Sequence, residues 1–204
     1  MVLDLKDVYL TSWNIFKKCW WQYVVVTLIL MFCMFIPYIG ALLQFFMMLL
    51  VLNATLKAVK GEDISFSSFF DFKKVFTVKT IIFVIIFAVY SFIMQLGVDS
   101  VIVSLILAIV GIAISIIFFP IMCVIIDKDL NVKDTILHAA ALTKGVRFEI
   151  VMVMVLNLFI GFLGVLLLVI GIFVALPIII ATTAVVYSVL EKKNNTPETA
   201  TIIE

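Results

Sequence analysis

Six long apolar runs without a single Asp, Glu, Lys or Arg dominate this sequence and restrict what it can fold into. They cover residues 20–36, 39–56, 80–96, 101–126, 150–170 and 172–190, and they are 17 to 26 residues long. A helix needs about 20 apolar residues, within a range of about 17–25, to cross the hydrocarbon of a bilayer. The six runs therefore predict a polytopic, all-α membrane protein with six transmembrane helices.

The composition supports this prediction. Of the 204 residues, 66% are hydrophobic and 13% are charged, whereas water-soluble domains average about 45–50% apolar and about 25% charged residues. A soluble fold of this size leaves too much of its surface in water to hide so much apolar side chain. The runs do not alternate in polarity as the strands of a transmembrane barrel would, so helices are expected.

The six runs pair into three hairpins. Residues 37–40 separate the first pair and residues 97–100 separate the second. The third pair lies within 41 charge-free residues, and we place its turn at Gly171, because Pro177 then falls near the start of the last helix. A turn at residues 161–164 is the alternative.

The basic residues predict how the chain is oriented. All 14 lie before the first run, after the second, after the fourth or after the sixth, and the three opposite turns contain only one charge, Asp99. Lys and Arg in short loops remain cytoplasmic. We therefore expect a multi-pass protein of the cell (inner) membrane with both termini in the cytoplasm and the first span acting as an uncleaved insertion signal. The net charge of +1 indicates no nucleic-acid partner.

Each hairpin is preceded by an amphipathic segment that ends in lysine. The first carries Trp13 and Phe16 on one face, the second carries Phe69 and Phe72, and the third covers residues 131–144 between an expected N-cap and a glycine stop. Such helices either lie in the membrane interface or pack under the bundle. Residues 1–192 are predicted to form a single six-helix transmembrane domain, and residues 193–204 a flexible cytoplasmic tail.

The sequence contains no catalytic, cofactor-binding or metal-binding signature. The single histidine, His138, cannot build a site of two or more histidines, and we expect it to be solvated or interfacial. Asp127 and Asp129 follow the fourth run and are interpreted as solvated loop charges. The three cysteines are expected to be small buried hydrophobic residues, because neither their number nor their spacing suits a disulfide framework or zinc.

A few polar side chains interrupt the predicted spans. Amides buried in membranes form hydrogen bonds between helices, with an average strength of about 0.6 kcal/mol. This structural role is the main expectation for them, and the lining of a small polar cavity is the alternative. The candidate intramembrane polar contacts are Gln44, Asn53, Gln95 and Asn157.

Several stretches resemble a bacterial membrane-domain family. They are residues 119–127, residues 139–145 and the late pattern Gly161-x-x-Gly164, Gly171, Pro177 and Ala184-x-x-Tyr187. The family includes the membrane domain attached to some glycerophosphoryl diester phosphodiesterases and many stand-alone proteins of uncharacterised role. The resemblance implies six helices and a bacterial inner membrane, and it transfers no catalytic residue.

These features predict a non-enzymatic integral membrane protein that has no cofactor and acts through contacts with membrane lipids or another membrane protein. The alternative is a permease, or a transport component, for a small apolar or lipid-like solute, because Pro120 and Pro177 can kink helices at transport sites. No charged residue lies inside the runs, which argues against a proton-coupled pump.

Overall fold

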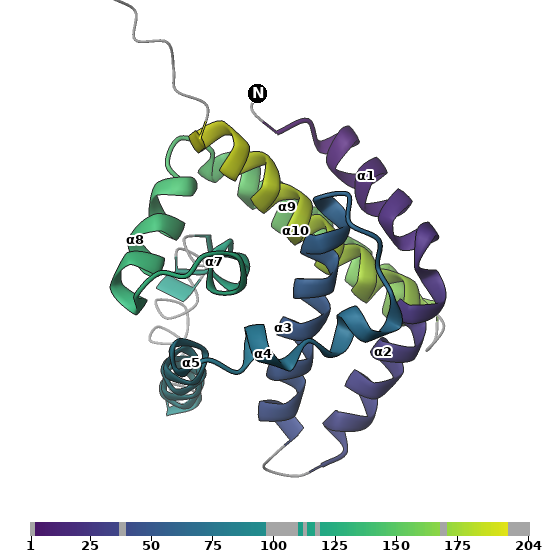
Figure 1. Ribbon diagram of the computed structural model, residues 1–204, viewed down its shortest axis with the longest axis horizontal. Helices are drawn as coiled ribbons and strands as arrows, with labels where there is room; N and C mark the ends of the chain where they lie inside the picture. The colour runs from purple at the N-terminus through teal and green to yellow at the C-terminus, as the bar shows by residue number, and fades with distance from the viewer. Residues whose placement is uncertain are drawn as a thin grey trace, which may run out of the picture.

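The computed structural model describes residues 3–36, 40–96, 110–111, 114–116, 119–167 and 171–195, except the side chains of 34, 40, 41, 87, 88 and 90–96. The regular structure of these residues is entirely helical and includes no strand (Figure 1). This confirms the all-α prediction for the described part. The elements are α1 Leu5–Lys18, α2 Trp20–Met34, α3 Gly40–Val59, the 3₁₀ helix η1 Phe66–Phe70, α4 Phe72–Val75, α5 Val78–Leu96, α7 Ile121–Asp127, α8 Val132–Leu142, α9 Arg147–Leu166 and α10 Ile172–Asn195.

Three described helices are long and apolar enough to cross a membrane: α3, α9 and α10. A fourth span results if α1 and α2, which meet at 90°, are counted as one bent span. These helices support a membrane-embedded protein. The predicted number of six stays a prediction, because most of the fourth apolar run lies outside the described residues.

The local sequence explains where α1 begins and ends. The Asp4 carboxylate accepts hydrogen bonds from the backbone N–H groups of Lys6 and Asp7, at 2.9 and 3.4 Å, and so caps the free end of the helix. Lys17 and Lys18 occupy the last turn, where their positive charges interact favourably with the negative end of the helix dipole. The chain then turns at Cys19 into the apolar α2.

The inner face of α1 packs along the α9–α10 hairpin, and Figure 1 shows α1 beside α10. The Leu3 backbone N–H donates to Glu149 of α9 at 2.8 Å, and the Thr182 hydroxyl of α10 lies 3.3 Å from the Ser12 hydroxyl. The opposite face of α1 is exposed. The first amphipathic segment is therefore a helix with one face against the bundle.

The second amphipathic segment differs from the prediction of one surface helix. It forms two short elements, η1 and α4, interrupted at Asp71. Phe69 is fully buried against the Tyr23 ring, with the centroids 5.3 Å apart, and Phe76 stacks on Phe46 at 4.4 Å. These aromatic contacts fold the segment onto α2 and α3, which explains why a straight helix does not form.

The third amphipathic segment matches its predicted bounds closely. Asn131 occupies the N-cap position of α8, although its side chain makes no capping hydrogen bond. Gly145 follows the helix with a φ of +82°, a conformation that glycine adopts without strain. The segment is correctly predicted from its start and stop signals.

Two glycines allow α9 and α10 to approach closely at their turn. A Cβ atom on Gly164 would lie 2.6 Å from the Ala175 Cβ, and one on Gly171 would lie 2.4 Å from the Gly164 carbonyl oxygen. Because α9 continues through Gly164 and ends at Leu166, the break before α10 confirms the turn predicted at Gly171 and not the alternative. Pro177 lies inside α10, near its start.

Two lysines that are predicted to share one membrane face line hollows at different levels of α10. Lys17 lines one hollow together with Phe173 of the first turn of α10, and Lys60 lines another together with Tyr187. About 21 Å of helix separates residues 173 and 187. If both lysines lie at one membrane face, the part of α10 between residues 173 and 187 lies close to the membrane plane.

Candidate functional site

A polar cluster joins the ends of α3, α7 and α10. The Asp127 carboxylate accepts a hydrogen bond from the Tyr187 hydroxyl at 2.9 Å and pairs with Lys60. The Asp127 side chain is only 16% exposed. The interpretation of Asp127 as a solvated loop charge is therefore wrong, because the end of α7 turns this carboxylate toward α10. Asp129 is fully exposed, and it lies 3.6 Å from Lys79.

Glu191 of α10 forms the second centre of this cluster. Its carboxylate lies 2.5 Å from the Lys128 ammonium, 3.0 Å from His138 Nε2 and 3.1 Å from the amide nitrogen of Asn195. The His138 side chain is 22% exposed and contacts Glu191, so it is not fully solvated, and its interfacial position stays a prediction. α8 places His138 against α10, and this contact was not predicted from the sequence.

A small hollow of about 270 Å³ lies between these groups. Acidic and basic side chains both line it, and the two carboxylates at its wall, Asp127 and Glu191, are each paired with a lysine. The part of the chain that the structure describes contains no group of three or more His, Cys, Asp or Glu that could hold a metal ion. The cluster holds α3, α7, α8 and α10 together. Its lining residues include Lys60, Asp127, Lys128, Tyr187 and Glu191.

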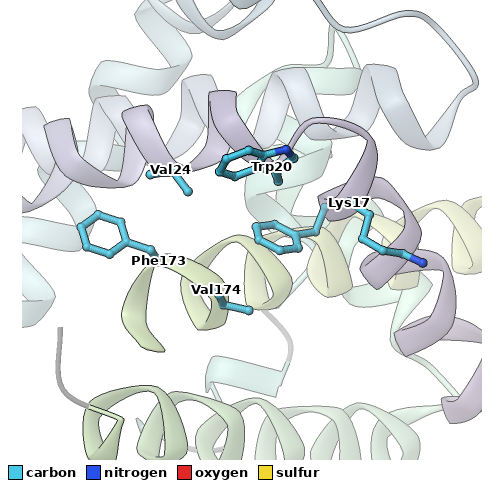
Figure 2. A pocket seen from close by; sticks show the side chains of 6 residues that line it. Lys17, Trp20, Val24, Phe173 and Val174 are labelled. Carbon is cyan, nitrogen blue, oxygen red and sulfur yellow. The ribbon is translucent and has the colours of Figure 1, made fainter. Parts of the chain in front are cut away.

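A second, larger hollow of about 470 Å³ lies at the elbow between α1 and α2. Figure 2 shows Trp20 and Val24 on one wall and Phe173 and Val174 on the other, with the Lys17 side chain leaving at one end. Phe16 completes the lining. Apart from Lys17, every lining side chain is aliphatic or aromatic, so this elbow hollow suits an apolar ligand.

The candidate polar residues occupy different surroundings. Asn157 is buried, and its amide oxygen accepts a 2.9 Å hydrogen bond from the Tyr9 hydroxyl. Gln44 is half-buried. Gln95 falls in α5, but its side chain lies outside the described residues. The structure therefore brings neither Gln44 nor Asn157 into a shared site with another of these candidates whose side chain it describes.

Asn53 is also buried, and its amide nitrogen makes no hydrogen bond of normal geometry with the described residues. It lies near Asp71, which the Lys57 ammonium contacts at 2.9 Å. This hydrogen bond from Lys57 outweighs partial burial and holds the pKa of the Asp71 carboxyl below its usual 3.8, with smaller contributions from Lys74 and the Asn53 amide.

The three cysteines are free and buried, as their apolar neighbours predict. Sequence reasoning missed the partners of Asp127 and Glu191, and it missed the elbow hollow. The spacing of Tyr187 and Glu191, four residues apart on one helix, was the only available signal for the polar cluster. Comparison of the chain with protein-family models, curated proteins and solved structures finds no match.

Proposed function

We propose that this chain is a non-enzymatic integral membrane protein that acts through contacts with lipids. The observation that carries the proposal is the outer face of α9, which exposes a continuous row of large apolar side chains. In water such a surface would drive aggregation, whereas in a bilayer it matches the acyl chains. Each side chain of the row is between 58% and 75% exposed, and the row comprises Val155, Leu158, Phe159, Phe162, Val165 and Leu166.

The finer topology belongs to the same proposal. Six spans, cytoplasmic termini and an inner-membrane location are supported by the lysine distribution and by the resemblance to the bacterial membrane-domain family. Single cysteines replacing Lys73 and Asp99 test this orientation in intact cells, since the native cysteines are buried. We expect an impermeant maleimide to label position 99 and not position 73. The reverse pattern would refute the orientation.

Lipid contact is favoured over the alternative of a permease by where the polar side chains point. The Thr182 hydroxyl donates to the Ile178 carbonyl oxygen within its own helix, and Asn157 binds Tyr9. These groups are occupied by neighbouring protein atoms, so they do not line an open polar path between the described helices. The elbow hollow lies at the surface of the helix assembly, beside exposed Trp20.

Lipid retention tests the proposed function. The full chain should stay in the membrane pellet after alkaline carbonate washing, and protein purified in mild detergent should carry phospholipid that mass spectrometry detects. A Phe162→Lys variant places a charge on the exposed face of α9 and should reduce membrane insertion. Lys6→Gln, a change on the exposed face of α1, is the control. A protein that is monodisperse without detergent and free of lipid would contradict the proposal.

A further inference from the structure

We propose that the elbow hollow binds one anionic glycerophospholipid, with an acyl chain inside the hollow and its phosphate beside Lys17. This inference rests on the proposed function and adds to it a site and a lipid class. Three properties of the hollow support it: a cation at its rim that forms no ion pair with the described residues, a change from polar to apolar along its wall, and its volume.

The cation at the rim is available to a ligand. Lys17 is exposed and makes no ion pair with any residue that the structure describes, whereas the adjacent Lys18 binds Asp63 at 2.9 Å. Figure 2 shows the Lys17 side chain leaving the hollow at one end, so its ammonium can meet a phosphate there while an acyl chain lies inside. An anionic headgroup therefore complements the charge of the rim.

The wall of the hollow follows the polarity profile of a lipid monolayer. Lys17 lies in the last turn of the amphipathic α1, Trp20 begins the apolar α2, and Val24 lies one turn, or about 6 Å, further along α2. Lysine and tryptophan are typical of the headgroup level, and valine of the hydrocarbon below it. The facing wall, Phe173 and Val174, is apolar and belongs to a charge-free stretch.

The volume and the position favour a lipid over a protein partner. The hollow of about 470 Å³ falls within the range of about 300–1,000 Å³ typical of small-molecule sites. Trp20, which lines the hollow, is 54% exposed, so the bilayer has direct access to the site. A phospholipid supplies both the apolar chain and the negative charge that the lining requires.

The test compares two lipids that share their acyl chains. Phosphatidylglycerol and phosphatidylcholine are titrated into the purified full-length protein, and bound lipid is counted by native mass spectrometry. We expect about fivefold tighter binding of phosphatidylglycerol, which is the contribution of one lysine near an anionic headgroup. Lys17→Gln should abolish this preference, and Lys6→Gln, on the same helix but away from the hollow, should preserve it.

A second pair of variants tests the hollow itself. Val24→Trp fills the space between α2 and α10 and should weaken the binding of both lipids. If this variant misfolds, Val174→Phe fills the hollow from the opposite wall and should have the same effect. An equal loss in Lys17→Gln and Lys6→Gln, or equal binding of the two lipids by the unmodified protein, would overturn the inference. Occupation of the hollow by a second copy, seen as a dimer that Val24→Trp dissolves, would also overturn it.

The two proposals fail in different ways. If purified protein retains phospholipid but shows no preference for phosphatidylglycerol, the elbow site is wrong and the proposed function stands. If the protein retains no phospholipid and leaves the membrane in carbonate, the proposed function is wrong as well.

Discussion

The Tyr187 hydroxyl donates a 2.9 Å hydrogen bond to the Asp127 carboxylate, and this contact joins α10 to the end of α7. The tyrosine is 1% exposed, so its side chain is buried at this contact. Tyr187 and Asp127 are 60 residues apart, and their contact fixes the direction in which the chain leaves the fourth apolar run. Lys60 reaches the same carboxylate from the end of α3.

The two contacts of Asp127 are expected to differ in strength. Tyr187→Phe removes the hydrogen bond to a charged acceptor and should lower the free energy of unfolding by about 1.5–3 kcal/mol. Asp127→Asn keeps a neutral acceptor for Tyr187, so it weakens that hydrogen bond without removing it, and it loses the ion pair with the half-exposed Lys60, which contributes about 0–1 kcal/mol. Denaturant unfolding in detergent micelles measures both variants. A larger loss in Asp127→Asn than in Tyr187→Phe would contradict this ranking.

The glycines of α9 provide a matched pair of substitutions. Gly164→Ala would place its Cβ 2.6 Å from the Ala175 Cβ, so α9 and α10 must separate, and the expected loss is about 1–3 kcal/mol. Gly161→Ala meets only the Ile179 side chain at 3.7 Å, an ordinary contact. Since alanine favours helices by about 1 kcal/mol over glycine, Gly161→Ala should be neutral or stabilising. Thermal unfolding followed by circular dichroism distinguishes the two, and equal effects would refute the close approach.

The sequence predicted the features that depend on the solvent and on local signals. Apolar runs without charge indicated helices, and the stop at Gly145 and the turn at Gly171 followed from rules that involve only neighbouring residues. These rules hold because each backbone segment must satisfy its own hydrogen bonds wherever the remainder of the chain lies.

Features that depend on distant residues were not predictable. Asp127 resembles a loop charge in the sequence because its partner Tyr187 lies 60 residues away. The residues around Phe69 likewise give no indication that its ring packs against Tyr23. The elbow hollow combines residues 16–24 with residues 173–174, which only the packing of α1 against α10 brings together. Periodicity identifies which face of a helix is apolar, and it does not identify which helix covers that face.

Asp71 should give the protein a dependence of stability on acid. Because its pKa is lowered in the folded protein, chiefly by the hydrogen bond from Lys57, its ionised form contributes stability above the ordinary pKa of 3.8. This contribution is lost as the pH falls through the lower, folded pKa. Asp71→Asn should therefore be less stable than the unmodified protein at neutral pH, and the two stability curves should converge in acid.

Urea unfolding at a series of pH values measures this convergence. Glu62→Gln is the control, because Glu62 is exposed and makes no ion pair with the described residues. Its curve should follow that of the unmodified protein throughout. If the difference caused by Asp71→Asn does not change with pH, the contact between Asp71 and Lys57 does not depend on the carboxylate charge.

The hydrogen bond from Tyr9 to Asn157 can be measured by a double-mutant cycle. Tyr9→Phe leaves the buried Asn157 amide oxygen without its 2.9 Å donor and should cost about 1 kcal/mol. Asn157→Leu replaces the amide with an apolar side chain in a helix whose neighbours are apolar, so it should cost less than leaving the amide unpaired. In Asn157→Leu the Tyr9 hydroxyl keeps only a weak acceptor, the Val153 carbonyl oxygen 3.3 Å away. Removing that hydroxyl as well should therefore cost little, and the double variant should be about as stable as Asn157→Leu alone. Additive losses in the cycle would show that Tyr9 and Asn157 contribute independently.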